Sequence, residues 1–417
     1  MKSFIERRLN QSYIRRMSIM ILAIYLIVLT VSFATAKRGR TIFGPFLGAD
    51  FGAFYVAGQI FNYHDPASIY DVPLHKRLYH ENFPDAPVNE ELTYANAPFF
   101  VVPFIFLSRL PYTLAYLAWL LISIALYVTG FLILWHALKY LPDEIRLTAL
   151  LLALSFWPFL VECLAGGQTS AFGFFCLALA IAIEPRTKFW SGVALALCAY
   201  KPTLLFLIVP MLLLTGRWLT IVGLAAGNLV LAVVSYILVG WQGCKSFVNR
   251  LLFYGAASTI EEGLRSWKYV DINSFMRLLL PQHGQLRLIL TALLVLLVIP
   301  FVVTFWWRFR NETHGRRLWA LTISCTPVLN IYMGIYDSTI LVLAVLLLTA
   351  EFFRLGVRPL PFGYKSLLLL LYLSPLFTQG IAMATGLQIY TLAVAAFGLW
   401  QLRTMSEQVP AGERALA

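Results

Sequence analysis

Long apolar runs separated by short polar segments dominate the pattern of this chain. The runs Met17 to Ala36, Tyr112 to Leu134, Leu219 to Gly240 and Leu286 to Trp307 each reach the roughly 20 residues that a helix needs to cross a bilayer. The strict alternation of a transmembrane β-strand is absent. Because a backbone in lipid must satisfy its own hydrogen bonds, these runs predict transmembrane helices.

The whole pattern predicts an all-α polytopic membrane protein with about twelve transmembrane helices. We place them near 17–36, 111–138, 147–165, 169–184, 188–200, 202–215, 218–240, 286–308, 317–331, 336–354, 365–379 and 385–403. The segments 188–200 and 202–215 are short and meet at Lys201-Pro202, where proline disfavours helix in the preceding residue. They form either two spans or one broken, re-entrant element. The stretch 97–108 is too short to span and predicts an interfacial helix or a membrane dip.

Composition agrees with this pattern, since 60% of the residues are hydrophobic and only 12% are charged. The N-terminus imitates a signal peptide, with arginines before an apolar run that ends Ala34-Thr35-Ala36. That run is longer than the roughly 7 to 15 residues of a signal sequence, which favours an uncleaved first helix. Four of the five cysteines fall in apolar segments, so no disulfide framework is predicted.

The formal net charge of +12 is explained by membrane topology rather than by nucleic-acid binding. One short loop holds four crowded arginines, Arg308, Arg310, Arg316 and Arg317, and cytoplasmic loops carry the excess of Lys and Arg. This predicts one membrane domain, 1–417, with cytoplasmic tails 1–16 and 404–417. The two long loops 37–110 and 241–285 are then external, and the first contains candidate interfacial helices at 51–62 and 72–83.

These loops are rich in Tyr and Trp, which suit either an interfacial aromatic belt or the stacking of sugar rings and packing of a lipid chain. The chain has no Rossmann or P-loop glycine motif and no zinc or calcium spacing. We therefore predict no cofactor and no metal.

Asp50 stands just outside the first long apolar run, in the stretch GADFGAFYVAG. One interpretation is an N-cap for a helix that begins at Phe51. The other is a general base that takes a proton from an attacking hydroxyl. The two roles are compatible.

A series of short motifs follows Asp50 between residues 45 and 340. The series comprises Phe54-Tyr55, Ala57-Gly58, Tyr70-Asp71, Ala97-Pro98, Leu110-Pro111-Tyr112, Gly167-Gln168-Thr169-Ser170, Tyr200-Lys201-Pro202, Arg217-Trp218 and Asn273-Ser274. In this order the motifs resemble glycosyltransferase family 87. The resemblance implies a membrane enzyme of the GT-C class, in the bacterial inner membrane with a periplasmic active site. It also implies a polyprenyl-phosphate sugar donor and a catalytic aspartate, here Asp50.

Such chemistry needs a base and groups that hold the departing lipid phosphate. The candidates for substrate contact are Lys201, Tyr55, Gln168, Arg265, Lys268, Asn273, Arg277, Tyr336 and Asp337. His283 is a further external cation. Lys201 is equally well explained as a snorkelling lysine, Asn273-Ser274 as a helix cap, and Asp337 as the cap of the next helix. Many family members have a histidine in the late external turn, whereas here residues 327–337 contain none.

The sequence therefore predicts an inverting glycosyltransferase that moves a sugar, mannose by analogy, to a glycan or glycolipid acceptor beside the membrane lipid. The rival hypotheses are a transporter or flippase of a lipid-linked or anionic solute, and a noncatalytic scaffold. A transporter is expected to tolerate replacement of Asp50.

Overall fold

The computed structural model describes residues 10–36, 40–42, 47–85, 92–260, 265–311 and 315–407. The described residues are mostly helical, and an isolated β-bridge pairs Tyr269 with Gly334. Arg7, Arg8 and most of the predicted tail 404–417 lie outside these ranges. Contacts divide the chain into two compact units with alternating segments. Unit 1 comprises 1–131, 142–175 and 228–253, and unit 2 comprises 132–141, 176–227 and 254–417.

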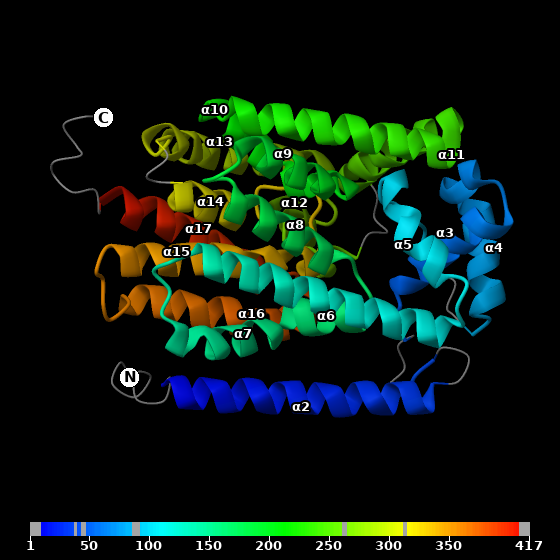
Figure 1. The fold of residues 1–417 in the computed structure, drawn as a ribbon, viewed down its shortest axis with the longest axis horizontal. Coiled ribbons are helices and arrows are strands. Elements are labelled where there is room, and N and C mark those ends of the chain that lie inside the picture. The colour runs from blue at the N-terminus through cyan, green and yellow to red at the C-terminus, as the bar shows by residue number, and fades with distance from the viewer. Residues whose placement is uncertain are drawn as a thin grey trace. The chain divides into compact units, whose positions relative to one another are not determined.

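Unit 1 holds the helices of the first predicted loop and the long helix before it. Its elements are α2 (Gln11–Thr35), α3 (Phe51–Tyr63), η1 (Pro66–Tyr70), α4 (Val72–Asn82), η3 (Pro98–Val101), α5 (Val102–Leu107), η4 (Asp143–Ile145), α7 (Arg146–Leu154) and the π-helix η5 (Pro158–Ala165). Most of α6 (Tyr112–Ala137) also belongs to it. Helix α3 packs against α4 and α5, as Figure 1 shows in blue and cyan, and α2 packs against α7.

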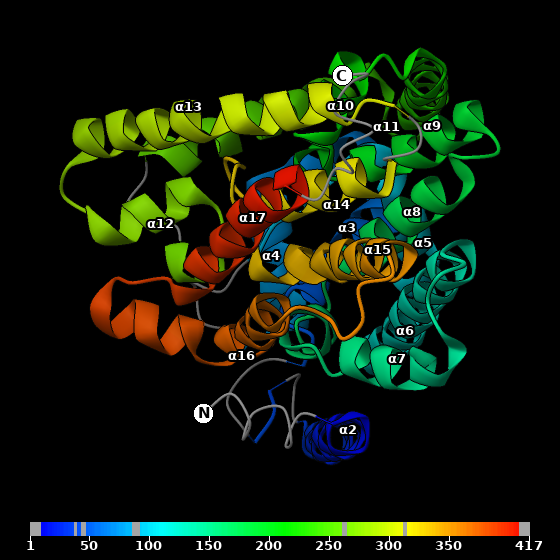
Figure 2. The same cartoon turned by 90° about the vertical axis from the view of Figure 1, so that its left-hand side faces the viewer.

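Unit 2 holds most of the C-terminal half. Its elements are α9 (Lys188–Ala196), η6 (Leu197–Tyr200), η7 (Pro202–Leu205), α10 (Ile208–Leu214), η8 (Ser266–Lys268), α12 (Ile272–Leu279), α13 (Gly284–Arg308), α14 (Gly315–Cys325), η10 (Ile335–Ile340), α15 (Leu341–Arg354), α16 (Phe362–Thr385) and α17 (Ile389–Glu407). Helices α8 (Ser170–Ile183) and α11 (Trp218–Ile260) contribute to both units. Within unit 2, α14 packs on α15 and α17, and α17 packs on α16 (Figure 2).

Membrane character is supported by helix length and composition. Six described helices are long and apolar enough to cross a bilayer, and a seventh arises if Asp143–Leu154 and Pro158–Ala165 form one span bent by 46°. Helices occur at all twelve predicted positions, but several of them are shorter than a span. The all-helical fold is confirmed, whereas twelve crossings and one membrane domain stay predictions.

The long helices differ in how much apolar surface they leave exposed. In α2 and α13 only 11% of the apolar window is buried, so most of their Leu, Ile and Val side chains are available to lipid. In the η10–α15 segment, 78% of the window is buried. This segment is therefore mostly covered by protein, and residues at its start are held by the packing around it.

Two breaks interrupt the helices at predicted boundaries. Lys201 has non-helical backbone dihedrals (φ −139°, ψ 87°) between η6 and η7, which confirms the predicted break at Lys201-Pro202. Gly240 kinks α11 with φ 65°, a value that glycine adopts without strain. The chain beyond Gly240 is helical as far as Ile260, so the predicted external segment 241–285 begins as helix rather than as loop.

Candidate active site

Asp50 occupies the N-cap position of α3, but its side chain makes no capping hydrogen bond. Its backbone N–H donates to the carbonyl oxygen of Gly166 over 2.9 Å. The capping interpretation of the carboxylate is therefore wrong, although the position was correct. Because the Asp50 carboxylate accepts no capping hydrogen bond from α3, it is available to other partners.

The partner is Gln168, which the sequence analysis listed among the substrate contacts. Its Nε2 donates to Asp50 Oδ2 over 2.5 Å within unit 1. Tyr116 donates to the carbonyl of Leu164 over 2.8 Å, and Trp119 donates to that of Gln168 over 3.3 Å. These bonds fix the turn that carries the amide, so the Asp50–Gln168 pair is held from several sides.

Gly167 makes the approach of this turn possible. Its φ of +71° suits glycine, and a Cβ here would lie 2.6 Å from Cβ of Phe51. The Phe51 ring packs against Tyr112 and Tyr116, with ring centroids 5.7 and 5.6 Å apart. The carboxylate of Asp50 therefore stands beside a buried aromatic cluster.

Tyr55 belongs to the same cluster as a structural member. It is buried, its ring meets that of Tyr112 edge-on, and its hydroxyl donates to the carbonyl of Leu110 over 2.8 Å. This bond ties α3 to the start of α6. Contact of Tyr55 with a substrate stays a prediction.

In unit 2 the structure brings together three predicted residues, Lys201, Tyr336 and Asp337. The ammonium of Lys201 forms an ion pair with the buried carboxylate of Asp337, and it lies 4.4 Å from the ring centre of Tyr336. Asn330 donates to the carbonyl of Thr203 over 2.8 Å, which joins the two segments. The ion pair uses one of the three lysine donors and holds the ammonium in place.

The segment before α12 is joined to the residues that precede Tyr336. The N–H of Val270 donates to Met333, and that of Ile272 donates to Val328, both over 2.9 Å. Asn273 donates to the carbonyl of Ile331 over 3.2 Å. The predicted cap at Asn273-Ser274 is wrong, because both residues lie inside the helix and Asp271 caps it.

Asp271 is a residue that the sequence analysis missed. It is fully buried and accepts hydrogen bonds from the N–H groups of Ser274 (2.8 Å) and Met333 (3.0 Å). Burial raises the pKa of the Asp271 carboxyl to about 7, although these hydrogen bonds act in the opposite direction. An aspartate directly before the first residue of a helix is a typical N-cap signal, and Asp271 directly precedes α12.

The remaining predicted cations have different surroundings. Arg265 and Lys268 are half-buried and lie in one turn, where the Lys268 N–H donates to the Arg265 carbonyl over 2.9 Å. Arg277 is buried in α12, and exposed His283 stands at the N-cap of α13. Among the described residues no three His, Cys, Asp or Glu side chains gather as a metal site.

Comparison with known proteins identifies the family. Residues 94–333, more than half of the chain, match the model of glycosyltransferase family 87. The chain belongs to glycosyltransferase family 87. No curated protein and no solved structure gives a match. The protein is thus a glycosyltransferase, with a sugar donor and an acceptor as its substrates.

The family match covers the candidate residues unevenly. Gln168, Lys201 and the residues from Arg265 to Arg277 fall inside it, whereas Asp50 and Asp337 fall outside. The case for Asp50 as the base of this family 87 enzyme therefore depends on its bond to Gln168, a residue within the matched range.

Proposed function

We propose that this family 87 protein is an inverting enzyme that transfers a sugar from a polyprenyl-phosphate donor to an acceptor hydroxyl at the external face of a bacterial inner membrane. The observation that supports this most is the 2.5 Å hydrogen bond from Gln168 to Asp50. An amide donor fixes a carboxylate without neutralising its charge, and a fixed carboxylate is suited to general base catalysis.

The proposed reaction is a single displacement. The carboxylate of Asp50 takes the proton of the acceptor hydroxyl while the hydroxyl oxygen of the acceptor attacks the anomeric carbon. The bond between the anomeric carbon and the phosphate oxygen breaks, and polyprenyl phosphate leaves with its electron pair. Because a phosphate leaves as an anion, no acid is needed to protonate it, and one attack from the opposite face inverts the configuration.

The departing phosphate requires positive charge, and Lys201 is the first proposed source of it. Lys201 is held in place by Asp337 and retains donors beyond the one used in that ion pair. Arg265, Lys268 and Arg277 are the further candidates for phosphate contact. We assign Tyr55, Asn273 and Asp337 supporting roles, because each makes a contact that joins two segments.

A lipid-linked donor agrees with the apolar character of the chain. A polyprenyl chain remains in the bilayer, so an enzyme that uses it gains from membrane-spanning helices, and six described helices have the required length. By analogy with the family the sugar is mannose, and the acceptor is a glycan or glycolipid.

The donor is tested with purified protein in proteoliposomes that contain extracted membrane acceptors. Radiolabelled polyprenyl-phosphate mannose is supplied in one arm and a nucleotide-linked mannose in the other. The proposal predicts labelled product only in the first arm, with the anomeric configuration inverted when the product is analysed by NMR. Transfer from the nucleotide donor alone would contradict the proposed donor. Movement of the lipid-linked sugar across the bilayer without transfer would favour the transporter.

A further inference from the structure

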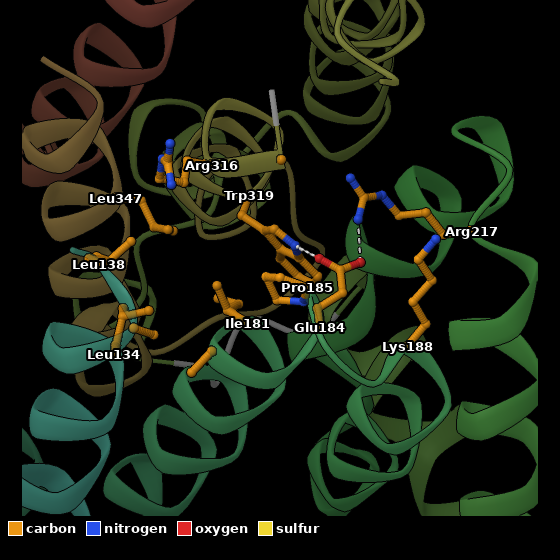
Figure 3. A pocket seen from close by; sticks show the side chains of 13 residues that line it. Leu134, Leu138, Ile181, Glu184, Pro185, Lys188, Arg217, Arg316, Trp319 and Leu347 are labelled. Atoms are coloured by element: carbon orange, nitrogen blue, oxygen red, sulfur yellow. Dashed lines mark hydrogen bonds and ion pairs between the residues drawn. The ribbon is translucent and has the colours of Figure 1, made fainter. Parts of the chain in front are cut away.

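A cavity of about 310 Å³ opens in unit 2, away from Lys201. It lies at the end of α8 and the start of α9, where Glu184 and Lys188 line it, and Figure 3 shows Arg217 and Trp319 around the same space. Lys188 begins α9, whereas Lys201 follows η6 after the other end of that helix. The charge distribution of the sequence predicts that this cavity is on the cytoplasmic side. It is therefore distinct from the candidate active site.

Positive charge exceeds negative charge around this cavity. The lining includes Lys188, Arg217 and Arg316, and its carboxylate is Glu184. Arg316 also contacts Glu351, but that carboxylate receives Arg317 and Arg354 as well. A second cavity of about 270 Å³ shares Lys188 and Arg217 and adds Arg310. Arg217 and Arg316 are half-buried, whereas Lys188 and Arg310 are exposed. Cations gathered in one place repel one another unless an anion is present.

Arg217 carries the strongest indication of a missing acceptor. Its side chain is only 11% exposed, and Nη1 forms an ion pair with Glu184, which also accepts a 2.7 Å hydrogen bond from Trp319. Nε and Nη2 are buried and have no hydrogen-bond partner in the structure. These two nitrogens form the side-on edge of the guanidinium, which binds two oxygens of one phosphate or carboxylate. Burying such donors without an acceptor costs free energy.

The other wall of the cavity is mainly apolar, with Arg316 beside Leu347 at its edge (Figure 3). Leu134, Leu138, Ile181 and Leu347 lie there, opposite Arg217 and Lys188 in Figure 3. We propose that this cavity binds the phosphate group of a small anionic ligand, which gives Arg217 the acceptors it lacks. The apolar wall suits the adjoining chains of an anionic phospholipid, and free phosphate would supply the same oxygens.

Binding is measured with purified full-length protein in detergent by titration and by the thermal unfolding midpoint. The probes are inorganic phosphate, short-chain phosphatidylglycerol and short-chain phosphatidylcholine, whose headgroup carries no net charge. The proposal predicts saturable binding of phosphatidylglycerol or inorganic phosphate, and weaker binding of phosphatidylcholine. Tighter binding of phosphatidylglycerol identifies a lipid as the source of the phosphate, and equal binding identifies the free anion. Binding of neither anion overturns the proposal.

The variants separate ligand binding from folding. Arg217→Gln alone leaves the Glu184 carboxylate buried without its ion pair, so it can fail to fold. The double variant R217Q/E184Q removes both charges, and we expect it to fold and to bind about tenfold or more weakly. Glu184→Gln keeps the guanidinium and should bind at least as tightly as wild type. Arg186 is an exposed arginine that lies between Glu184 and Lys188 in the sequence but does not line the cavity. Arg186→Gln should therefore leave binding unchanged. Wild-type affinity in the double variant overturns the proposal.

Residues 312–314 precede the lining residue Gly315 in the sequence and contain one carboxylate, Glu312. An E312Q variant therefore serves as a further control. Unchanged phosphate binding by E312Q supports the proposal. Binding by E312Q but not by wild type would mean that the chain's own carboxylate fills the site, and would overturn it.

Discussion

Breaking the Lys201–Asp337 ion pair from its two sides is expected to cause unequal losses of stability. The Asp337 side chain is fully buried, whereas the Lys201 side chain is 20% exposed and also faces the ring of Tyr336. Lys201→Met leaves a buried carboxylate without its charge partner, which costs about 3–5 kcal/mol. Asp337→Asn leaves a lysine that can reach water, and we expect a loss of about 1–3 kcal/mol.

The double variant K201M/D337N distinguishes the structural role of Lys201 from its proposed contact with phosphate. With both charges removed, no charge stays buried, so the double variant should be more stable than K201M alone. If Lys201 also contacts the donor phosphate, sugar transfer in the double variant remains reduced, on the order of 100-fold. Stability and activity are thus expected to separate.

Stability is measured by denaturant unfolding in mixed detergent micelles, and activity by transfer in membranes with equal protein levels. Lys245→Met, at an exposed lysine of the predicted external segment, is the control and should change neither. A double variant as unstable as K201M would show that the two side chains are not coupled. Recovery of activity together with stability would refute the phosphate contact and leave Lys201 a structural role.

Three further predictions concern unit 1 and the buried titratable groups. Gln168→Leu removes the donor to Asp50, and we expect transfer to fall at least tenfold with little change in expression, whereas unchanged transfer would argue against a positioned base. Because the folded-state pKa of Asp271 is raised to about 7, its contribution to stability is present below pH 4 and is lost as the pH rises towards 7. Burial lowers the pKa of His75 to about 3, so its contribution is present above pH 6.5 and is lost as the pH falls towards 3. Unfolding of D271N and H75Q across this pH range should lack the respective slope, and slopes equal to wild type in either variant would contradict that assignment.

The helical positions could be predicted because the apolar runs are long and are separated by clear breaks. Lys201-Pro202 is an example, since the steric effect of proline on the preceding residue is local and visible in the sequence. The number of crossings was harder to predict, because segments such as Ser170–Ile183 are apolar but short. Apolarity alone does not separate a short span from a buried helix.

The contacts within the candidate site depend on residues that are distant in the sequence. Lys201 and Asp337 were considered separately, and no local pattern links positions 136 residues apart. Asp50 was correctly placed before a helix, but its side chain bonds Gln168 rather than capping. Gln388 was missed for the same reason, although its amide donates to the carbonyls of Trp267 and Tyr269, both over 2.9 Å.

Sugar transfer by an Asp50→Asn protein tests the central claim most directly. Asn keeps the size of the side chain and one oxygen but cannot take the proton, so the rate should fall by about 10²–10⁴-fold. The matched control is Asp65→Asn, because Asp65 is an exposed aspartate of the same predicted loop that caps η1 through Ala67. We predict that transfer from polyprenyl-phosphate mannose is lost in D50N and retained in D65N, at equal expression. Equal transfer by D50N and wild type would remove Asp50 from catalysis and contradict the proposed mechanism.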